Sequence, residues 1–489
     1  MAVNGSSTST DPSTPGGPAA VEHFDVIIVG ARCAGSPLAT LLARAGLKVV
    51  VLEQATFPRP TLSSHLLEAD GLSFLSRLGV LGPVEKTGVR FMKHTDTRLG
   101  DFRVHAPFPL AFDDPGGAAF LQRHLLDAIL ADAAAESGAD LRMGTRVVEV
   151  LWHRGRVCGV RAEKGGVTTR LHAPLVVGAD GRASTVAYMC GSHKYNVNHN
   201  QRSYYFTFFE GADPAYDDLF VFHRWGDRMV WAGPADNGLY LVGVSPEQHE
   251  RDYFRRETEA GLLAHMRVCE PTAKALAGAR IAQKISGIVK FDGYLRQASG
   301  PGWVLVGDAG HFKDPSAGRG IGDAFLQVEA LAPAIVASLD GSGHGGADET
   351  LRRWGVWRDR RFEGHYWLAT TLGEAGPLPG AVPEALRRLH ERGQLDRFFD
   401  LFSHRSRYYD VFPLRDMGLA TARRLVAGSQ PRGPLLKETL GLLAREPRRR
   451  WINRRPALAS SDLTAPPVAR TPRTARPDQR ETADAAHNG

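Results

Sequence analysis

The stretch from Phe24 to Glu53 constrains the fold more than any other part of this 489-residue chain. A β-branched apolar run, Val26–Val29, ends at Gly30, a helix-compatible segment follows over Ser36–Arg44, and a second β-branched run ends at Glu53. This order of strand, glycine turn, helix, strand and acid is typical of a dinucleotide-binding βαβ unit. The turn would bring backbone N–H groups and a helix N-terminus, with about half a positive charge, onto a pyrophosphate.

The glycine loop departs from the G-x-G-x-x-G pattern, because Arg32 stands where the second glycine would lie between Gly30 and Gly35. Arg32 fits if its side chain turns away, or it faces the phosphate as a charge partner. The alternative is an ordinary tight βα turn. Glu53, placed to accept hydrogen bonds from ribose hydroxyls, favours the nucleotide site. Residues 341–346 match the full glycine pattern, but no strand precedes them, so we expect a flexible loop there.

Composition and charge exclude several classes of function. The four cysteines are widely spaced without a C-x-x-C pair, so we expect neither a metal site nor a disulfide framework, and a reducing cytoplasm fits best. Of the net charge of +7, +4 lies in residues 446–489, where nine arginines stand against five acidic residues. The near-neutral remainder argues against a nucleic-acid partner. No apolar run approaches the roughly twenty residues that span a bilayer.

The segment that follows the second strand is predicted to form a helix and short strands. The amphipathic run Leu66–Leu78 ends at Gly79, with Ser63 or Ser64 as its N-cap. Residues 88–112 alternate as short strands.

A second helix is predicted over Gln122–Ser137, with Arg123 in its first turn. A cation there opposes the helix dipole, so Arg123 is either a surface arginine or the partner of an anion. Turn residues separate the short apolar runs of residues 140–172, which predicts a β-meander.

Two further strands end in acidic turns. Leu175–Gly178 runs into Asp180 and Gly181, for which the alternative is a common Asp-Gly turn. The second, Trp303–Val306, runs into Gly307 and Asp308. Asp308 could be a helix-entry cap, but Pro315, Gly318 and Gly320, before a helix predicted over Ile321–Leu339, are more than a cap needs.

Residues 202–290 are rich in aromatic side chains and alternate as strands, interrupted by a helix predicted over Arg251–Glu270. We expect an antiparallel sheet with one face toward a ligand. A large aromatic core face is the alternative, and the two do not exclude each other.

The three strand-to-turn sites, in this order around a meander and an antiparallel sheet, resemble the flavoprotein monooxygenase superfamily of the aromatic hydroxylases. The same scaffold serves geranylgeranyl-type reductases and flavin-dependent halogenases. The resemblance covers roughly residues 23–340 and implies an α/β fold: a Rossmann-like FAD-binding domain with a β-meander, an antiparallel substrate domain and a helical C-terminal region.

The resemblance also implies roles for single residues. The glycine loop would bind the ADP pyrophosphate, Glu53 the adenosine ribose, and Asp308 the ribityl chain, while the helix after Gly318 would face the flavin ring. The implied FAD-binding residues are Gly30, Arg32, Gly35, Glu53, Arg123, Asp180, Gly181, Asp308, Gly318 and Gly320, and Tyr205, Phe222 and Trp231 are expected to wall the substrate pocket.

The activity implied is that of an FAD-dependent monooxygenase of secondary metabolism. NADPH or NADH would reduce the flavin by transient docking, and O2 would form a C4a-hydroperoxide that hydroxylates a small aromatic or polyketide-like substrate. No protein acid or base is obligatory. His65 and His311 could move protons near neutral pH, although a structural or solvated histidine is the plainer interpretation of each.

Three rival functions remain open. A flavin-dependent reductase of alkene or prenyl groups would share the scaffold. A halogenase would carry Trp-x-Trp-x-Ile-Pro where residues 229–234 read Met-Val-Trp-Ala-Gly-Pro, and Lys93 lies in the region of its catalytic lysine. A surface lysine is the simpler interpretation of Lys93. The third rival is a flavin-binding protein without turnover.

We expect the following organisation: a disordered leader over 1–22, an FAD-binding domain over 23–200 and 291–340, a substrate-binding domain over 201–290, a helical region over 341–445 and a disordered basic tail over 446–489. The substrate, the choice between NADH and NADPH, and the oligomeric state are not encoded in any motif that we recognise.

Overall fold

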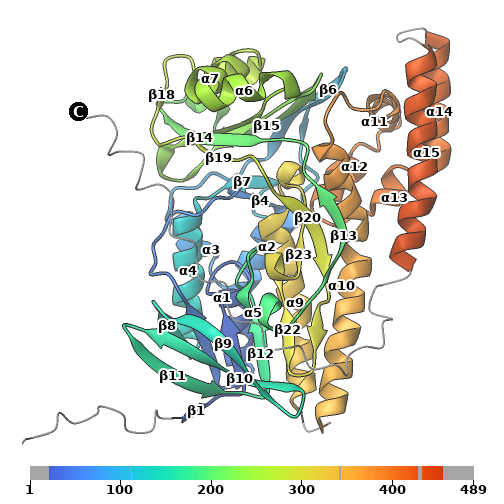
Figure 1. The fold of residues 1–489 in the computed structure, drawn as a ribbon. Helices are drawn as coiled ribbons and strands as arrows, with labels where there is room; N and C mark the ends of the chain where they lie inside the picture. The colour runs from blue at the N-terminus through green and yellow to red at the C-terminus, as the bar shows by residue number, and fades with distance from the viewer. Residues whose placement is uncertain (1–20, 112, 341–342, 428–431, 455–489) are drawn as a thin grey trace, which may run out of the picture.

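The computed structural model describes residues 21–111, 113–340, 343–427 and 432–454 (Figure 1). Its central element is a six-stranded sheet whose inner strands are buried on both faces. In β2 (Val26–Val29), Val26 and Ile28 pack on one side of the sheet, and Ile27 and Val29 pack on the other. This burial explains the continuous β-branched run in the sequence, because a parallel sheet covered on both faces has no polar side.

The strand order of this sheet places the predicted turns along one edge. Four of the neighbouring pairs are parallel, so the strand ends that carry the Gly30, Asp180 and Asp308 turns lie side by side. The order is β21 (Ser299–Gly300), β22 (Trp303–Leu305), β12 (Leu175–Gly178), β2, β3 (Val49–Glu53) and β8 (Asp140–Met143).

The two faces of the parallel sheet are covered differently. One is covered by a four-stranded sheet, in the order β1 (Val21–His23), β11 (Val167–His172), β10 (Arg156–Lys164) and β9 (Arg146–His153). It contains the meander predicted over residues 140–172 except for its first strand, which lies in the parallel sheet as β8. The other is covered by helices α1 (Gly35–Arg44), α4 (Arg123–Glu136) and α9 (Gly320–Ser338). The predicted fold class is confirmed by this arrangement.

An eight-stranded, mainly antiparallel sheet forms the upper part of the molecule in Figure 1, with α6 (Arg251–Arg256) and α7 (Thr258–Arg267) on its outer side. Its main path runs β18 (Arg280–Ile281), β14 (Tyr204–Glu210), β17 (Tyr240–Ser245), β16 (Arg228–Pro234), β15 (Leu219–Trp225), β5 (His94–Leu99) and β6 (Phe102–Pro107), and β19 (Ser286–Ile288) pairs with β14.

Strands β5 and β6 come from residues that the sequence assigned to the FAD-binding domain. β15 pairs with β5 in parallel, with Leu219 opposite His94. No local pattern in the sequence could show a pairing between strands so far apart in the chain. We propose that residues 94–107 belong to the substrate domain together with 201–290.

Two small sheets join the large ones. β4 (Leu66–Glu68) pairs with β7 (Ala118–Phe120), and β20 (Asp292–Arg296) pairs with both β13 (Lys194–His199) and β23 (His311–Phe312). The sequence predicted one helix over Leu66–Leu78, whereas the helix α2 spans only Ala69–Leu78. Pairing with β7 holds residues 66–68 extended, so Glu68 and not Ser63 or Ser64 precedes the helix. Gly79 ends it in the left-handed conformation, as predicted.

Other helix boundaries differ from the predictions. The single helix predicted over Arg251–Glu270 is divided into α6, α7 and α8 (Glu270–Ala275). Residue 343, inside the glycine run expected as a loop, begins α10 (Gly343–Gly373). The remaining helices are α3 (Leu81–Glu85), α5 (Thr185–Met189), α11 (Ala381–Glu391), α12 (Asp396–Phe402), α13 (Tyr408–Val411), α14 (Leu414–Ala427) and α15 (Arg432–Arg454).

The predicted disordered ends fall largely outside the described residues. Where they are described, the prediction is wrong: residues 21–22 lie in β1 and residues 446–454 lie in α15. Among the described residues, α9 alone is long and apolar enough to cross a membrane. It packs in the core against α1 and α10, which accounts for its apolar character without a membrane.

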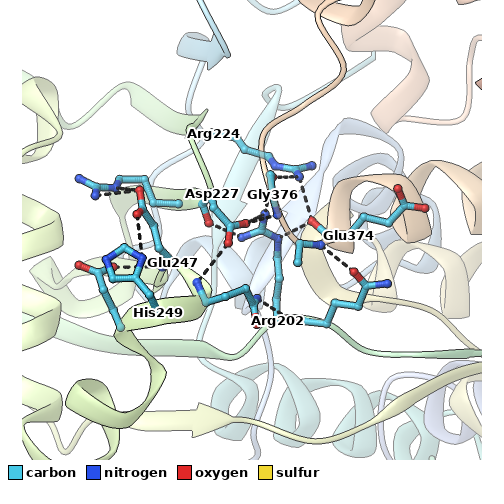
Figure 2. A network of polar contacts seen from close by, with 12 residues as sticks. Arg202, Arg224, Asp227, Glu247, His249, Glu374 and Gly376 are labelled. Atoms are coloured by element: carbon cyan, nitrogen blue, oxygen red, sulfur yellow. Dashed lines mark hydrogen bonds and ion pairs between the residues drawn. The ribbon is translucent and has the colours of Figure 1, made fainter. Parts of the chain in front are cut away.

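Two buried arginines tie the end of α10 to the eight-stranded sheet (Figure 2). The guanidinium groups of Arg202 and Arg224 donate hydrogen bonds to the backbone carbonyls of Glu374 and Gly376. Asp227 holds Arg202 at 2.6 Å and also accepts a hydrogen bond from the Gly376 N–H. Glu374 and Gly376 follow the end of α10. Within the helix, the Thr371 carbonyl is one of the last four, which lack a helical partner, and it accepts a hydrogen bond from Arg224.

Candidate active site

A cavity of about 1440 Å³ runs from the turns at the edge of the parallel sheet to the inner face of the eight-stranded sheet. It exceeds the roughly 300–1,000 Å³ that a single small ligand usually occupies. The predicted site residues that line it are Gly30, Arg32, Glu53, Arg123, Asp180, Gly181, Phe222, Trp231, Asp308, His311, Gly318 and Gly320. The structure therefore brings together residues from all three predicted turns.

Two glycines of the first turn are required by close packing. Gly30 has φ +102°, and a Cβ atom there would lie 2.5 Å from the Ala179 carbonyl oxygen. A Cβ atom on Gly35 would lie 1.7 Å from the Gly30 carbonyl oxygen. Gly35 does not line the cavity itself; it lets α1 start directly against the end of β2, so that the helix N-terminus faces the cavity.

The Glu53 carboxylate is fixed across the same turn. One oxygen accepts a hydrogen bond from the Ala31 N–H and the other from the Ala55 N–H, both at 2.9 Å. Each carboxylate oxygen can accept more than one hydrogen bond, so Glu53 is held in place and still able to accept from a hydroxyl group in the cavity.

Arg32 and Arg123 converge on Asp127, a residue that the sequence analysis missed. Arg123 donates to the Asp127 carboxylate at 2.8 and 3.0 Å, Arg32 donates at 3.3 Å, and the Asp127 side chain is only 1% exposed. Arg123 thus has the anionic partner that its position in the first turn of α4 called for. The four-residue spacing on one helix was the available signal.

Asp180 is held by the helix that follows it. Its Oδ2 accepts hydrogen bonds from the N–H groups of Thr185 and Val186 at the start of α5, whereas its buried Oδ1 has no partner among the described residues. Gly181, next to it, has φ +75°. A buried acceptor without a partner is costly, which favours a donor from a ligand here.

Asp308 has a free carboxylate at the cavity wall. No described group hydrogen-bonds to it, and burial raises its pKa to about 6 against the opposing charges of Arg182 and Arg123. The nearby Gly318 has φ +69° and leads into α9, whose first residue, Gly320, lines the cavity. A Cβ atom on Gly320 would meet nothing within 4 Å, so the approach to this helix N-terminus is open.

Of the three aromatic residues predicted to wall the substrate pocket, two line the cavity and one does not. Phe222 and Trp231 line it, but Tyr205 does not, because Tyr205 lies on the other face of β14 against Phe254, with ring centroids 5.3 Å apart. Phe222 pairs with Trp231, Trp231 with Gly243, and Gly243 with Phe206, so the matching residue on β14 is Phe206. The period-two alternation of strands assigns Tyr204 and Phe206 to the inner face, and both line the cavity.

The three candidate catalytic residues are not brought together. His65 does not line the cavity; its Nδ1 accepts a hydrogen bond from the Arg123 N–H, and burial lowers its pKa to about 3. His311 lines the cavity, but burial lowers its pKa to about 3 as well. Neither histidine would change protonation near neutral pH. Lys93, just before β5, is exposed and does not line the cavity.

Comparison with known families decides the assignment of the fold. Residues 23–351 match the family model described as FAD binding domain, which is more than half of the chain. This chain belongs to the FAD binding domain family. The predicted superfamily is therefore confirmed, and the match includes all three turns around the cavity.

Curated relatives of this FAD-binding protein include reductases. It is 28% identical to digeranylgeranylglycerophospholipid reductase of Methanothrix thermoacetophila over 68% of this chain and 83% of that protein. It is also 28% identical to menaquinone reductase of Mycolicibacterium smegmatis over 73% of this chain and 85% of that protein.

Solved structures with this fold include halogenases and hydroxylases. The myxobacterial chondrochloren halogenase CndH has a TM-score of 0.63 and 22% identity, covering 82% of this chain and 97% of that one. Aklavinone-11 hydroxylase, in a ternary complex with FAD and aklavinone, has a TM-score of 0.55 and 21% identity, covering 71% and 68%. These similarities establish the fold and leave the reaction open.

The residues present fit FAD. The cavity offers a helix N-terminus at each of two places, α1 and α9, a fixed carboxylate at Glu53, and acceptors without partners at Asp180 and Asp308. A dinucleotide needs donors for its pyrophosphate and acceptors for its ribose and ribityl hydroxyls, and both sets are here. An FAD-dependent oxidoreductase is the enzyme class that this family and this site support together.

Proposed function

We propose that this protein is an FAD-dependent monooxygenase that uses NADPH or NADH and O2 to hydroxylate a small aromatic or polyketide-like substrate. The observation that carries the proposal is the continuity of the cavity. The same space that contains Asp308 and the α9 N-terminus extends to an apolar chamber walled by Tyr204, Phe206, Phe222 and Trp231. An aromatic ring bound there would lie next to the redox group, out of contact with water.

The chain would hold FAD through the three turns. The Gly30 turn and the start of α1 would bind the pyrophosphate, Glu53 the adenosine ribose, and Asp308 the ribityl hydroxyls. When bound, FAD would supply the electron transfer and the activation of O2. The N-terminus of α9 would stabilise negative charge that develops on the reacting ring.

The Trp231 side chain lines the apolar chamber. The Trp231 ring lies over Gly243, where a Cβ atom would be 1.9 Å from the indole. The buried indole Nε1–H has no hydrogen-bond partner among the described residues. That N–H is covered by Gly243, where a Cβ atom would lie 2.5 Å from Nε1, so Trp231 contributes apolar ring surface to the chamber and not a hydrogen-bond donor.

A reductase of alkene or prenyl groups is the second candidate, because the two curated relatives described above are named as reductases. An apolar chamber would suit a prenyl chain as well as an aromatic ring. A halogenase is disfavoured, because Lys93, the residue that suggested it, lies outside the cavity.

Isotope labelling separates these candidates. The FAD-loaded, reduced protein would be mixed rapidly with buffer containing ¹⁸O2 and a panel of aromatic and polyketide-like compounds. A product that contains one ¹⁸O atom supports the monooxygenase. A product that gains two hydrogen atoms and no ¹⁸O, under anaerobic conditions as well, would instead establish the reductase.

A further inference from the structure

Three cationic side chains line the cavity on the side of the Asp180 turn. Arg182 belongs to that turn, Lys194 is the first residue of β13, and Arg296 is the last residue of β20. β13 and β20 are antiparallel neighbours, with Lys194 opposite Arg296, so these two side chains point to the same face of the small sheet (Figure 1). We call the three residues the cation cluster.

Two aromatic rings hold the cation cluster at the cavity. The Lys194 ammonium group lies 4.1 Å from the centre of the Tyr294 ring, and the Arg296 guanidinium group lies 5.1 Å from the same centre. The Arg182 guanidinium group lies 5.0 Å from the centre of the Phe312 ring. A ring face attracts a cation by its charge but offers no acceptor oxygen to its N–H groups, so these groups remain available to a ligand.

The Tyr294 side chain connects the cation cluster to the proposed FAD site. Its hydroxyl group donates a hydrogen bond to the Asp308 carbonyl oxygen at 2.7 Å and lies 3.1 Å from the Arg182 carbonyl oxygen. The Tyr294 ring also lies beside the Phe312 ring, with centroids 6.1 Å apart. The cluster is therefore fixed next to the turn that carries Asp308.

The cation cluster has no anion of its own. Arg182 and Lys194 form neither a hydrogen bond nor an ion pair with their side chains in the part of the chain that the structure describes. Arg296 donates a hydrogen bond to the Ser192 carbonyl at 3.2 Å, but its buried Nε–H has no partner there. Burial and the charge of Arg296 lower the pKa of Lys194, as expected for cations gathered without a counter-charge.

The neighbouring charges do not fill this place. Asp308 and Asp292 act on the cluster only at longer range, without an ion pair to any of its three members. Asp292 lies instead 2.9 Å from Nδ1 of His199. The buried Arg358 and Asp359, whose helix packs behind β20, form a pair of their own. The three cations thus share two distant carboxylates.

A phosphate group matches this arrangement. A phosphate monoester carries about −1.5 to −2 charges at pH 7 and has three acceptor oxygens. A guanidinium group binds two such oxygens at once, and an ammonium group adds a compact charge. The pyrophosphate of FAD already has donors at the Gly30 turn and the start of α1, which are different elements. The phosphate that suits the cluster therefore belongs to another ligand.

We propose that Arg182, Lys194 and Arg296 form a binding site for a phosphate group on a ligand that enters the cavity beside FAD. This inference rests on the proposed function, which requires two such ligands, the reductant and the substrate. NADPH carries a phosphate ester on its adenosine ribose that NADH lacks, so binding of the reductant here would select NADPH. A phosphorylated substrate would present the same chemistry to the same three cations.

Calorimetric titration of the FAD-loaded protein tests the site without turnover. NADP⁺ is compared with NAD⁺, since the two differ only in the ribose phosphate, and naphthyl phosphate is compared with naphthol as an aromatic substrate probe. The phosphorylated member of one pair should bind the wild-type protein roughly 10-fold or more tightly than its partner. The pair that shows this preference identifies the source of the phosphate.

Three variants and a control assign the preference to the cluster. Arg182→Gln and Lys194→Gln, both at exposed positions, should each reduce it roughly 10-fold, whereas Lys194→Arg should keep it. The control is Lys290→Gln, which removes an exposed lysine that does not line the cavity, and it should leave the preference unchanged. The inference is overturned by a wild-type protein without a preference in either pair, or by a preference that survives in both glutamine variants.

The affinity for FAD separates this site from that of the cofactor. Lys194→Gln should bind FAD as the wild-type protein does in equilibrium dialysis. A loss of FAD affinity as large as the loss of probe affinity would assign the cluster to the FAD site and overturn the inference. Failure of the proposed function shows separately, as wild-type protein that prefers a phosphorylated probe but forms no product containing ¹⁸O.

Discussion

The Arg123 guanidinium lies 2.8 Å from the carboxylate of Asp127, one helical turn further along α4. That carboxylate also receives Arg32 from the glycine turn, so one buried anion positions both cations at the cavity wall. The position of the two arginines thus depends on a residue that does not itself line the cavity.

Replacing Asp127 should therefore weaken both the fold and FAD binding. Asp127→Asn leaves two cations close together without a counter-charge, and breaking a buried ion pair in this way costs about 3–5 kcal/mol. Thermal unfolding and FAD titration measure the two effects. Asp132→Asn, an exposed position on the same helix, is the control and should change neither. Wild-type stability in Asp127→Asn would show that the pair is not important for the fold.

Asp308→Ala should reduce FAD retention. The carboxylate has no described partner within the protein, so its loss removes acceptors for a ligand without breaking an internal hydrogen bond. A hydrogen bond to a charged group contributes about 1.5–3 kcal/mol, which corresponds to roughly 10- to 100-fold in affinity. Equilibrium dialysis measures the change in FAD affinity, and Asp292→Ala, at an exposed position, is the control. Full FAD occupancy in Asp308→Ala would count against this placement of the cofactor.

Tyr205 and Phe206 lie on opposite faces of β14, so their replacement by alanine should have different effects on KM and on stability. Phe206→Ala enlarges the chamber and should raise KM for an aromatic substrate, with a modest loss of stability. Tyr205→Ala leaves a void against Phe254 behind the sheet, and it should lower stability by about 3–5 kcal/mol while leaving KM unchanged. Chemical denaturation and steady-state kinetics on both variants test the assignment of faces. The reverse pattern would mean that the inner face of β14 has been misassigned.

The free energy of unfolding should depend on pH because of the raised pKa of Glu68. Its pKa is raised from 4.5 to about 8 on folding, so between these values the folded state holds a proton that the unfolded state has lost. The contribution to the free energy of unfolding is complete below about pH 4.5 and is lost as the pH rises to about 8, at about 1.4 kcal/mol per unit of pKa difference. Glu68→Gln should flatten this slope in urea denaturation, and an unchanged slope would contradict the raised pKa.

The arginines at the end of α10 should matter more than arginines on the surface. Arg202→Met removes the partner of three backbone carbonyls and of Asp227, and should cost several kcal/mol in stability. Arg280→Met breaks an exposed pair with Glu210 and should change the stability little, because solvent screens such a pair. Equal effects in calorimetry would mean that the contacts in Figure 2 contribute little.

Local sequence was enough for the inner strands of the parallel sheet and their turns. The strands β2, β3, β12 and β22 are short apolar runs that lead into glycine or an acid, and parallel strands bring their ends to one edge, so Gly30, Asp180 and Asp308 could be placed together without coordinates. The edge strand β8 has no such run and was assigned to the meander. The same kind of inference failed for Tyr205, because strand alternation fixes which residues share a face but not which face is inside.

Features that depend on contacts between residues far apart in the sequence were not predicted. β4 is extended because β7, about fifty residues later in the sequence, pairs with it, and this pairing also carries Glu68 to the cavity wall. Asp127 could have been found from its spacing to Arg123, but its contact with Arg32 depends on how α4 packs beside the glycine turn. The unpaired oxygen of Glu68 has no signature in the sequence, because only the packing of β4 beside Arg319 determines which groups reach it.

The pairing of β15 with β5 affects how the protein folds during synthesis and which fragments of it can fold alone. The substrate sheet is complete only when residues 94–107 and residues 219–225 have both left the ribosome, so its closure must wait through the synthesis of the meander between them. A fragment limited to residues 201–290 would expose the edge of β15 as a ready template for other chains, and should aggregate. Transplanting this sheet into another scaffold would therefore require two separate insertions.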